Sequence, residues 1–211
     1  MKSAILYAVG ALCLAASGAG AVSITNGSFE TGPVVLAQGF TTLSAGDTSI
    51  TGWTVGGPVG VDYIGSYWVA EDGTHSIDVA GSGDGSLSQS IATNAGYRYQ
   101  VTFWLAANPD GPPPTKILDV DTGGPATAYT FPIGSNTKTS MGWTQETYDF
   151  TATSATTVLT FASDVQSNYG PALDNVSISV VPEPATWALM IGGLGMVGYG
   201  LRRRATKSAL A

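Results

Sequence analysis

The chain has 211 residues, of which 28 are glycine and only 11% are charged. This length suits one domain with terminal segments, and so few charges argue against a helix bundle or a coiled coil. The formal net charge of −7 argues against nucleic acid as a partner, because phosphate contacts need clustered Lys and Arg. Most of the basic residues lie at the two chain ends, and only Arg98, Lys116 and Lys138 lie in the long acidic middle.

The N-terminal segment has the pattern of a secretory signal peptide. Lys2 precedes an almost wholly apolar run at residues 4–16, and small residues follow at 19–21. We therefore expect residues 1–21 to be a signal peptide, the alternative being a retained N-terminal anchor. The lone cysteine, Cys13, lies inside the apolar run, so the exported chain would have no disulfide.

Residues 22–181 contain short runs of alternating apolar and polar residues separated by Gly, Pro, Asn and Asp. The clearest run covers residues 97–107, and its period of two is typical of a half-buried strand. No amphipathic helix of useful length interrupts these runs. We predict an all-β domain, an antiparallel β-sandwich or jelly roll. Further strands are expected at residues 24–30, 48–55, 76–79, 86–91, 116–120, 128–131, 143–152, 156–163 and 175–181.

The C-terminal segment has the pattern of a membrane anchor. Residues 185–201 carry no charge, with Trp187 and Tyr199 near the two ends, where interfacial aromatic residues are common. The basic residues that follow would hold residues 202–211 in the cytoplasm. We predict a single transmembrane helix at 185–201, the alternative being a buried core helix.

One motif stands directly before this apolar run. Pro182, Glu183 and Pro184 precede it, and Arg202, Arg203 and Arg204 follow it. This order resembles the PEP-CTERM sorting signal, over residues 182–204. The resemblance implies recognition by an exosortase, a membrane protease of Gram-negative bacteria that make exopolysaccharide, and cleavage near the Pro-Glu-Pro motif. The two prolines disfavour helix and strand, so an extended and accessible peptide is expected there.

Several short strings in the middle of the chain together resemble a second family. They are found at residues 26–30, 52–53, 73–78, 97–106 and 170–176. In this order they are similar to the choice-of-anchor C family, which is itself similar to a family of plant cell-wall proteins of unassigned function. The resemblance implies a galactose-binding-like jelly roll, a fold that includes many carbohydrate-binding modules.

The same resemblance implies one structural calcium ion that links the first and last strands. The matching positions are Glu30 and Asp174, with main-chain or hydroxyl oxygens near Ser28 and Gly73. Hard oxygen ligands of this kind suit calcium. Asp174 shares strand parity with Val176, so it is expected to point inward, where a carboxylate needs a cation or donors. The alternative is that both acids accept hydrogen bonds from the backbone.

Aromatic residues are the candidates for sugar binding, because sugar rings stack on exposed aromatic rings. Tyr63, Tyr67 and Trp68 cluster in a glycine-rich stretch, and Trp104 lies on the polar face of the clearest strand. The alternative for each is ordinary packing in a β core.

Catalysis has little support in the sequence. The chain has a single histidine, His75, and no Gly-x-Ser-x-Gly motif that would provide a nucleophilic serine for it to activate. A zinc site would need more His or Cys ligands than the chain offers. We therefore expect no enzymatic activity and no catalytic residue.

Together these features predict an exported protein with a transient anchor in the inner membrane, delivered to the cell surface or the extracellular matrix. Its partners would be an exosortase-type protease and extracellular polysaccharide, which it would bind or organise, as in a biofilm matrix. The alternative is a structural or adhesive matrix protein without sugar specificity.

Overall fold

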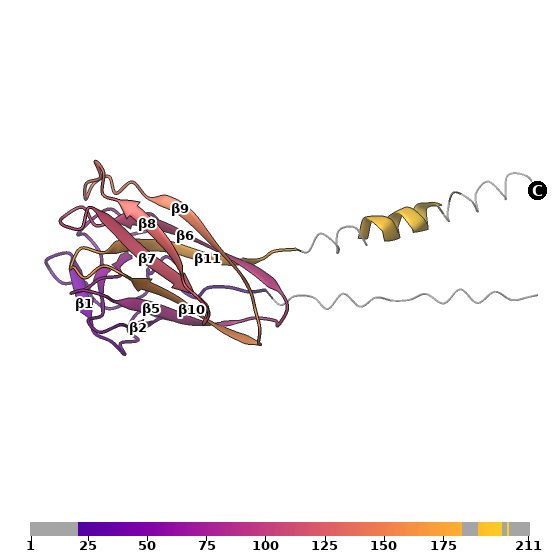
Figure 1. Cartoon of the computed structure of the whole chain (residues 1–211), viewed down its shortest axis with the longest axis horizontal. Coiled ribbons are helices and arrows are strands. Elements are labelled where there is room, and N and C mark those ends of the chain that lie inside the picture. Colours follow the sequence, from indigo (N-terminus) through magenta and orange to yellow (C-terminus); the bar gives the residue numbers. More distant parts are fainter. Residues whose placement is uncertain (1–20, 183–189, 200–201, 203–211) are drawn as a thin grey trace, which may run out of the picture.

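The computed structural model describes residues 21–182, 190–199 and 202. Within these residues, eleven strands form two antiparallel sheets, which pack face to face (Figure 1). This confirms the prediction of an all-β antiparallel sandwich. The predicted signal peptide lies outside the described residues, apart from residue 21.

The six-stranded sheet brings together strands that are far apart in the sequence. In this sheet, β11 (Pro171–Val180) pairs with β6 (Arg98–Ala107) on one side and with the short β4 (Ser76–Asp78) on the other. In spatial order the strands are β1 (Phe40–Leu43), β3 (Val61–Ile64), β4 (Ser76–Asp78), β11 (Pro171–Val180), β6 (Arg98–Ala107) and β9 (Thr144–Thr151).

The five-stranded sheet is built around β10, which pairs with β5 on one side and with β7 on the other. In spatial order the strands are β2 (Thr54–Gly56), β5 (Ser86–Ala92), β10 (Thr156–Ser163), β7 (Thr115–Asp121) and β8 (Thr127–Pro132).

The core fills the space between the inner faces of the two sheets. In β6, Val101, Phe103 and Leu105 are fully buried there, while Thr102 and Trp104 point to the outer face and stay partly exposed. This is the alternation that the sequence predicts for residues 97–107. The ring of Phe103 meets the Phe161 ring of the opposite sheet edge-on, with the centroids 5.2 Å apart.

A β-bulge in β11 changes which residues share a face. The register with β6 shifts between Asp174 and Ser177, where Asn175 adopts a positive φ of 45°. Leu173 packs in the core, so Asp174 points to the outer face and lies opposite Trp104, whereas Val176 returns to the core. The expectation that Asp174 points inward with Val176 was therefore wrong, because a bulge resets strand parity.

Residues 24–30, expected as a strand, form turns instead. Asn26 has a φ of 52° and Phe29 a φ of 58°, neither compatible with an extended strand. The Asn26 side chain bonds both the N–H and the carbonyl of Thr31, at 3.0 and 2.9 Å. Local side-chain bonds of this kind replace the ladder of a sheet.

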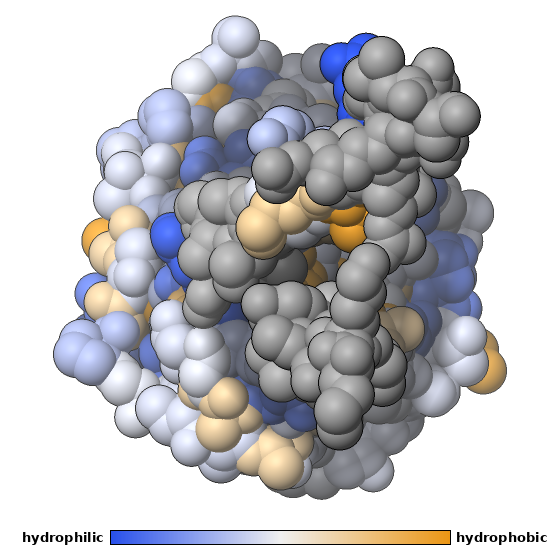
Figure 2. All heavy atoms as spheres, turned by 90° about the vertical axis from the view of Figure 1, so that its right-hand side faces the viewer, coloured by the Kyte–Doolittle hydropathy of each residue, from blue (hydrophilic) through white to orange (hydrophobic). Residues whose placement is uncertain are grey.

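The C-terminal helix lies beyond the end of β11, on the right in Figure 1, and covers residues 190–199. Its Ile191, Leu194 and Met196 side chains are 67%, 69% and 75% exposed. The sandwich surface described around this end is mainly hydrophilic or near-neutral, with scattered hydrophobic residues (Figure 2). Among the described helices, none has the length and apolar character needed to cross a membrane. The predicted span at 185–201 is described only in part, and it stays a prediction.

Candidate functional site

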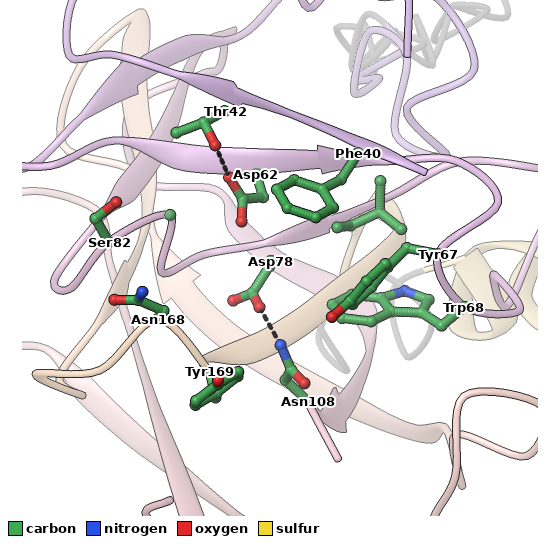
Figure 3. A pocket seen from close by; sticks show the side chains of 12 residues that line it. Phe40, Thr42, Asp62, Tyr67, Trp68, Asp78, Ser82, Asn108, Asn168 and Tyr169 are labelled. Carbon is green, nitrogen blue, oxygen red and sulfur yellow. Dashed lines mark hydrogen bonds between the residues drawn. The ribbon is translucent and has the colours of Figure 1, made fainter. Parts of the chain in front are cut away.

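A cavity of about 350 Å³ lies over the outer face of the six-stranded sheet, at the end where β11 begins. Figure 3 shows how its lining is divided. Phe40, Tyr67 and Trp68 lie on one side, Tyr169 lies on the other, and acidic side chains stand between them. A hollow of this size is at the small end of the range for ligand pockets, about 300–1,000 Å³.

The floor of the cavity is one row of cross-strand neighbours. Thr42 of β1 pairs with Asp62 of β3, and Asp62 pairs with Asp78 of β4. The row continues through Ala172 and Ala106, whose small side chains leave space beside the carboxylates. Two carboxylates directly opposite each other repel, so this pair opposes folding when both are ionised.

Asp62 is the less constrained of the two acids. Its side chain is only 7% exposed, and one carboxylate oxygen accepts a hydrogen bond from the Thr42 hydroxyl at 2.6 Å. Burial raises the pKa of Asp62 to about 6, against the opposing effect of the Thr42 bond.

Asp78 is held by three donors. Its carboxylate accepts hydrogen bonds from the N–H of Ala80 at 3.0 Å and of Gly170 at 3.1 Å, and from the Asn108 side-chain amide at 2.7 Å. Burial raises the pKa of Asp78 to about 8, and the negative charge of Asp62 adds to this shift. Burial and mutual repulsion thus both favour a protonated carboxyl group in this pair over two ionised ones.

The aromatic wall is fixed by its own bonds. The Trp68 indole donates to the Ser76 hydroxyl at 2.8 Å. The Tyr67 hydroxyl donates to Asp110, and Lys138 lies 3.6 Å from the centroid of the Tyr67 ring while pairing with Asp110 at 2.8 Å. These contacts hold Tyr67 and Trp68 in place before any ligand binds.

The four aromatic candidates from the sequence separate into two groups. Tyr67 and Trp68 line the cavity. Tyr63 does not, because it points to the inner face, is 1% exposed, and donates its hydroxyl to the Phe29 carbonyl at 2.7 Å. Trp104 lies on the outer face opposite Asp174, away from the cavity lining.

Three of the four residues named for calcium, Glu30, Gly73 and Asp174, meet around the segment 71–75, between β3 and β4. One Glu30 carboxylate oxygen accepts from the N–H groups of Thr74 and His75, both at 2.8 Å, and the other from the Thr74 hydroxyl at 2.9 Å. Although burial raises the pKa of Glu30, these bonds lower it overall. Gly73, with a φ of 66°, lies so close that a Cβ there would be 2.4 Å from Glu30 Oε1.

Asp174 holds the same segment from the other side. Its Oδ2 accepts from the N–H groups of Glu71 at 2.8 Å and Asp72 at 3.1 Å, and its Oδ1 from Asn175 at 2.7 Å. Burial raises the pKa of Asp174 to about 7. Both acids thus bond the backbone, which was the alternative to calcium, and Ser28 lies nearby in the turn before Phe29.

The metal prediction gains no support from these contacts. In the described part of the chain, no three His, Cys, Asp or Glu side chains are grouped so as to hold a metal ion. The Glu30 oxygens are occupied by N–H and O–H donors, which does not fit a calcium ligand in this arrangement. The calcium ion stays a prediction.

Sequence reasoning missed Asp62, Asp78, Asn108 and Tyr169 as site residues. They come from β3, β4, the end of β6 and the loop before β11, and only the sheet brings them together.

Two family models match the chain. Residues 22–179 match a family described as "Protein of unknown function (DUF642)", and residues 180–204 match the PEP-CTERM protein-sorting motif. The second match confirms the resemblance of the C-terminal segment. The described residues within that segment are 180–182, 190–199 and 202, so Glu183, Pro184, Arg203 and Arg204 lie outside them.

Known proteins with similar sequence or structure were also found. The chain is 33% identical over 166 residues to halomucin of Haloquadratum walsbyi (strain DSM 16790 / HBSQ001), covering 76% of this chain but only 2% of halomucin. Among solved structures, it is similar to TmCBM61 in complex with β-1,4-galactotriose (TM-score 0.46, 19% identity, 74% of this chain and 96% of that chain). It is also similar to the CBM22-1 xylan-binding domain of Paenibacillus barcinonensis Xyn10C (TM-score 0.41, 16% identity, 72% and 97%). At these TM-scores the likeness carries no argument about a ligand.

Proposed function

The chain belongs to the DUF642 family and carries a PEP-CTERM protein-sorting motif at residues 180–204. From that premise we propose that it is an exported surface or matrix protein whose outer-face cavity binds extracellular polysaccharide. An exosortase-type protease would process it after a transient stay in the inner membrane.

The observation that carries the proposal is the composition of the cavity. Phe40 and Tyr67 are partly exposed and offer aromatic surface to the apolar face of a sugar ring, and Asp62 offers a carboxylate oxygen to its hydroxyl groups. Trp68 is only 4% exposed and packs against Tyr67, with the ring centroids 5.7 Å apart. Asp78 and Asn108 are bonded to each other and fix the floor of the cavity. A pocket lined by aromatic side chains with a few fixed polar groups is the usual form of a small-ligand site. Tyr67 is already held by Asp110 and Lys138, so its side chain would lose little conformational entropy when a ligand binds.

The position of the cavity suits display to the outside. The cavity lies at the start of β11, and the sorting motif follows the end of that strand. The ten residues of β11, at ~3.3 Å each, separate the two by about 30 Å. A ligand at the cavity would therefore bind at the end of the sandwich remote from the sorting segment (Figure 1).

We propose binding without catalysis. Asp78 is engaged by Ala80, Gly170 and Asn108 as a fixed acceptor, which leaves it poorly placed to move as a general acid or a nucleophile. His75 contacts Glu30 and stacks on Tyr63, with ring centroids 5.0 Å apart, so it too serves the frame around the segment 71–75.

The second candidate function is a structural matrix module without sugar specificity. The burial of two aromatic candidates favours it, because Tyr63 is 1% and Trp68 is 4% exposed, and buried rings serve packing rather than stacking on a sugar.

A binding screen against a panel of polysaccharides, with the purified full-length protein, tests the proposal. Tyr67→Ala is expected to weaken binding of any polysaccharide that the wild type retains. Tyr97→Ala is the matched control, since Tyr97 is also partly exposed but lies at the start of β6, at the other end of the sandwich. Equal binding by both folded variants would exclude the cavity, and a folded wild type that binds nothing would favour the structural candidate.

A further inference from the structure

The cavity has an acidic lining without a matching cation. Among the described residues that line it, none is Lys or Arg. Two lysines lie behind the lining, and one of them, Lys116, feels the negative charge of Asp78. Lys138 pairs with Asp110 behind the Tyr67 ring, and Lys116 donates to the Gly111 carbonyl at 2.7 Å. A carboxylate buried away from water needs a donor or a cation to offset its lost hydration.

Asp62 is the acidic residue of the lining that has an unpaired oxygen. Its Oδ1 accepts the Thr42 hydroxyl, while Oδ2 accepts no hydrogen bond from the described part of the chain. Oδ2 is not among the fully buried polar atoms that lack a partner, so it opens to the cavity. Figure 3 shows the Asp62 carboxylate aimed into the hollow with the Phe40 ring beside it, and Tyr67 farther along the same wall. The residue as a whole is only 7% exposed. An acceptor of this kind, next to aromatic faces, is the environment that an ammonium group prefers.

We propose that the cavity selects a glycan with a free amino group, a hexosamine unit whose ammonium donates to Asp62 while its ring lies against Phe40 and Tyr67. This rests on the proposed function and deepens it by naming the class of sugar. The same lining would reject uronic acids, because a third carboxylate would face Asp62 and Asp78 in a poorly hydrated space. Acetylation of the amine removes the charge and so removes the preference.

The pH dependence of binding follows from the groups around Asp62. Below about pH 6 Asp62 takes up a proton, because burial raises its pKa to about 6, and the ammonium loses its counter-charge. At alkaline pH the amine loses its own proton, so the affinity should have a bell-shaped profile. Asp78 on β4 and Thr42 on β1 face Asp62 directly. Tyr67 and Tyr169 complete the titratable lining, and Lys116, Asp110 and Lys138 lie behind it.

Calorimetric titration of the purified full-length protein with three probes tests this. The probes are a β-1,4-linked glucosamine oligosaccharide, its N-acetylated counterpart and a galacturonic acid oligosaccharide of the same length. A hydrogen bond to a charged group is stronger than one between neutral groups. The amino probe should therefore bind about 10- to 100-fold more tightly than the acetylated one, and the uronic acid probe should bind most weakly.

Two variants and one control test the role of Asp62 directly. Asp62→Asn, which preserves size, should abolish the preference for the amino probe, and Asp149→Asn on the exposed part of β9 is the matched control. Thr42→Val removes the bond that favours ionised Asp62, so the low-pH limb of the profile should move to higher pH. This shift is a readout that mere misfolding would not produce.

The outcomes separate the two claims. Equal or tighter binding of the acetylated probe, unchanged in Asp62→Asn, would overturn the amino-sugar inference and leave polysaccharide binding intact. If none of the probes and no polysaccharide in the wider panel bound, both claims would fail. Binding of the amino probe that requires added Ca²⁺ and is lost with EDTA would overturn the inference, because a metal would then be the cation at Asp62.

Discussion

The two faces of the six-stranded sheet contrast sharply, although the same strands build both. On the inner face, Tyr63, Ile77 and Leu105 are buried in a continuous apolar core. On the outer face, their immediate neighbours Asp62 and Asp78 are acidic and line a hollow. Strand alternation thus lets one stretch of sequence serve stability on one side and recognition on the other. Changes on the two faces should therefore have separable effects.

The largest expected effect is on the inner face. Phe103→Ala should destabilise the protein by about 3–5 kcal/mol, because the ring is fully buried and a cavity would remain between Phe161 and Tyr129. Chemical denaturation would measure the loss. The polysaccharide affinity of the remaining folded molecules should not change. A cost below about 1 kcal/mol would contradict the assignment of this ring to the core.

The next largest effect is expected at Asp174, which holds the segment 71–75 on the outer face of the sheet. Asp174→Ala leaves the N–H groups of Glu71 and Asp72 without their acceptor and should cost about 1–3 kcal/mol. The same variant tests the calcium predicted from the family resemblance. A melting temperature that rises with Ca²⁺ in the wild type but not in Asp174→Ala would confirm that ion, and no rise in the wild type would contradict it.

The acidic outer face should also make stability depend on pH. Burial raises the pKa values of Asp62, Asp174 and Asp78 to about 6, 7 and 8, so the folded protein holds protons that the unfolded chain releases. Stability should therefore fall as the pH rises from about 4 to 8 and then level off. Thermal melts at pH 5 and pH 8 measure this, and Asp78→Asn should flatten the difference. A melting temperature that increases over this range would contradict the burial of these acids.

The smallest expected effect is at the exposed end of β6. Arg98 pairs with Asp149 at 3.0 Å, but both side chains are well exposed, at 57% and 38%. Arg98→Ala should cost less than about 1 kcal/mol and leave binding unchanged. A larger loss, measured by the same denaturation, would show that this end contributes more to the fold than its exposure suggests.

Local pattern was enough to predict part of this molecule. The alternation at residues 97–107 predicted the half-buried strand that the structure shows as β6. The adjacent Tyr67 and Trp68 were named as aromatic candidates, and both line the cavity. Tyr63 was assigned wrongly because β3 was not expected as a strand, so its alternation was not applied. The bulge at Asn175 likewise reversed the expected direction of Asp174.

The polar half of the cavity could not be predicted in the same way. Asp62 and Asp78 become neighbours only through the register of β3 with β4. Asn108 follows β6, and its contact with Asp78 of β4 depends on β4 and β6 flanking the same strand, β11. Register depends on turn geometry and on packing across the whole sheet. These strand pairings therefore could not be predicted from the pattern of a single sequence.

The most direct test of the cavity is the response of the tryptophan indole N–H signals in a ¹H–¹⁵N NMR titration with the β-1,4-linked glucosamine oligosaccharide. Trp68 lines the cavity, Trp104 lies on the same face outside it, and Trp53 is buried in the core. Binding in the cavity predicts that the Trp68 signal shifts while the Trp53 and Trp104 signals stay in place. A shift of Trp104 with Trp68 unmoved would contradict the account and place the ligand elsewhere on the sheet.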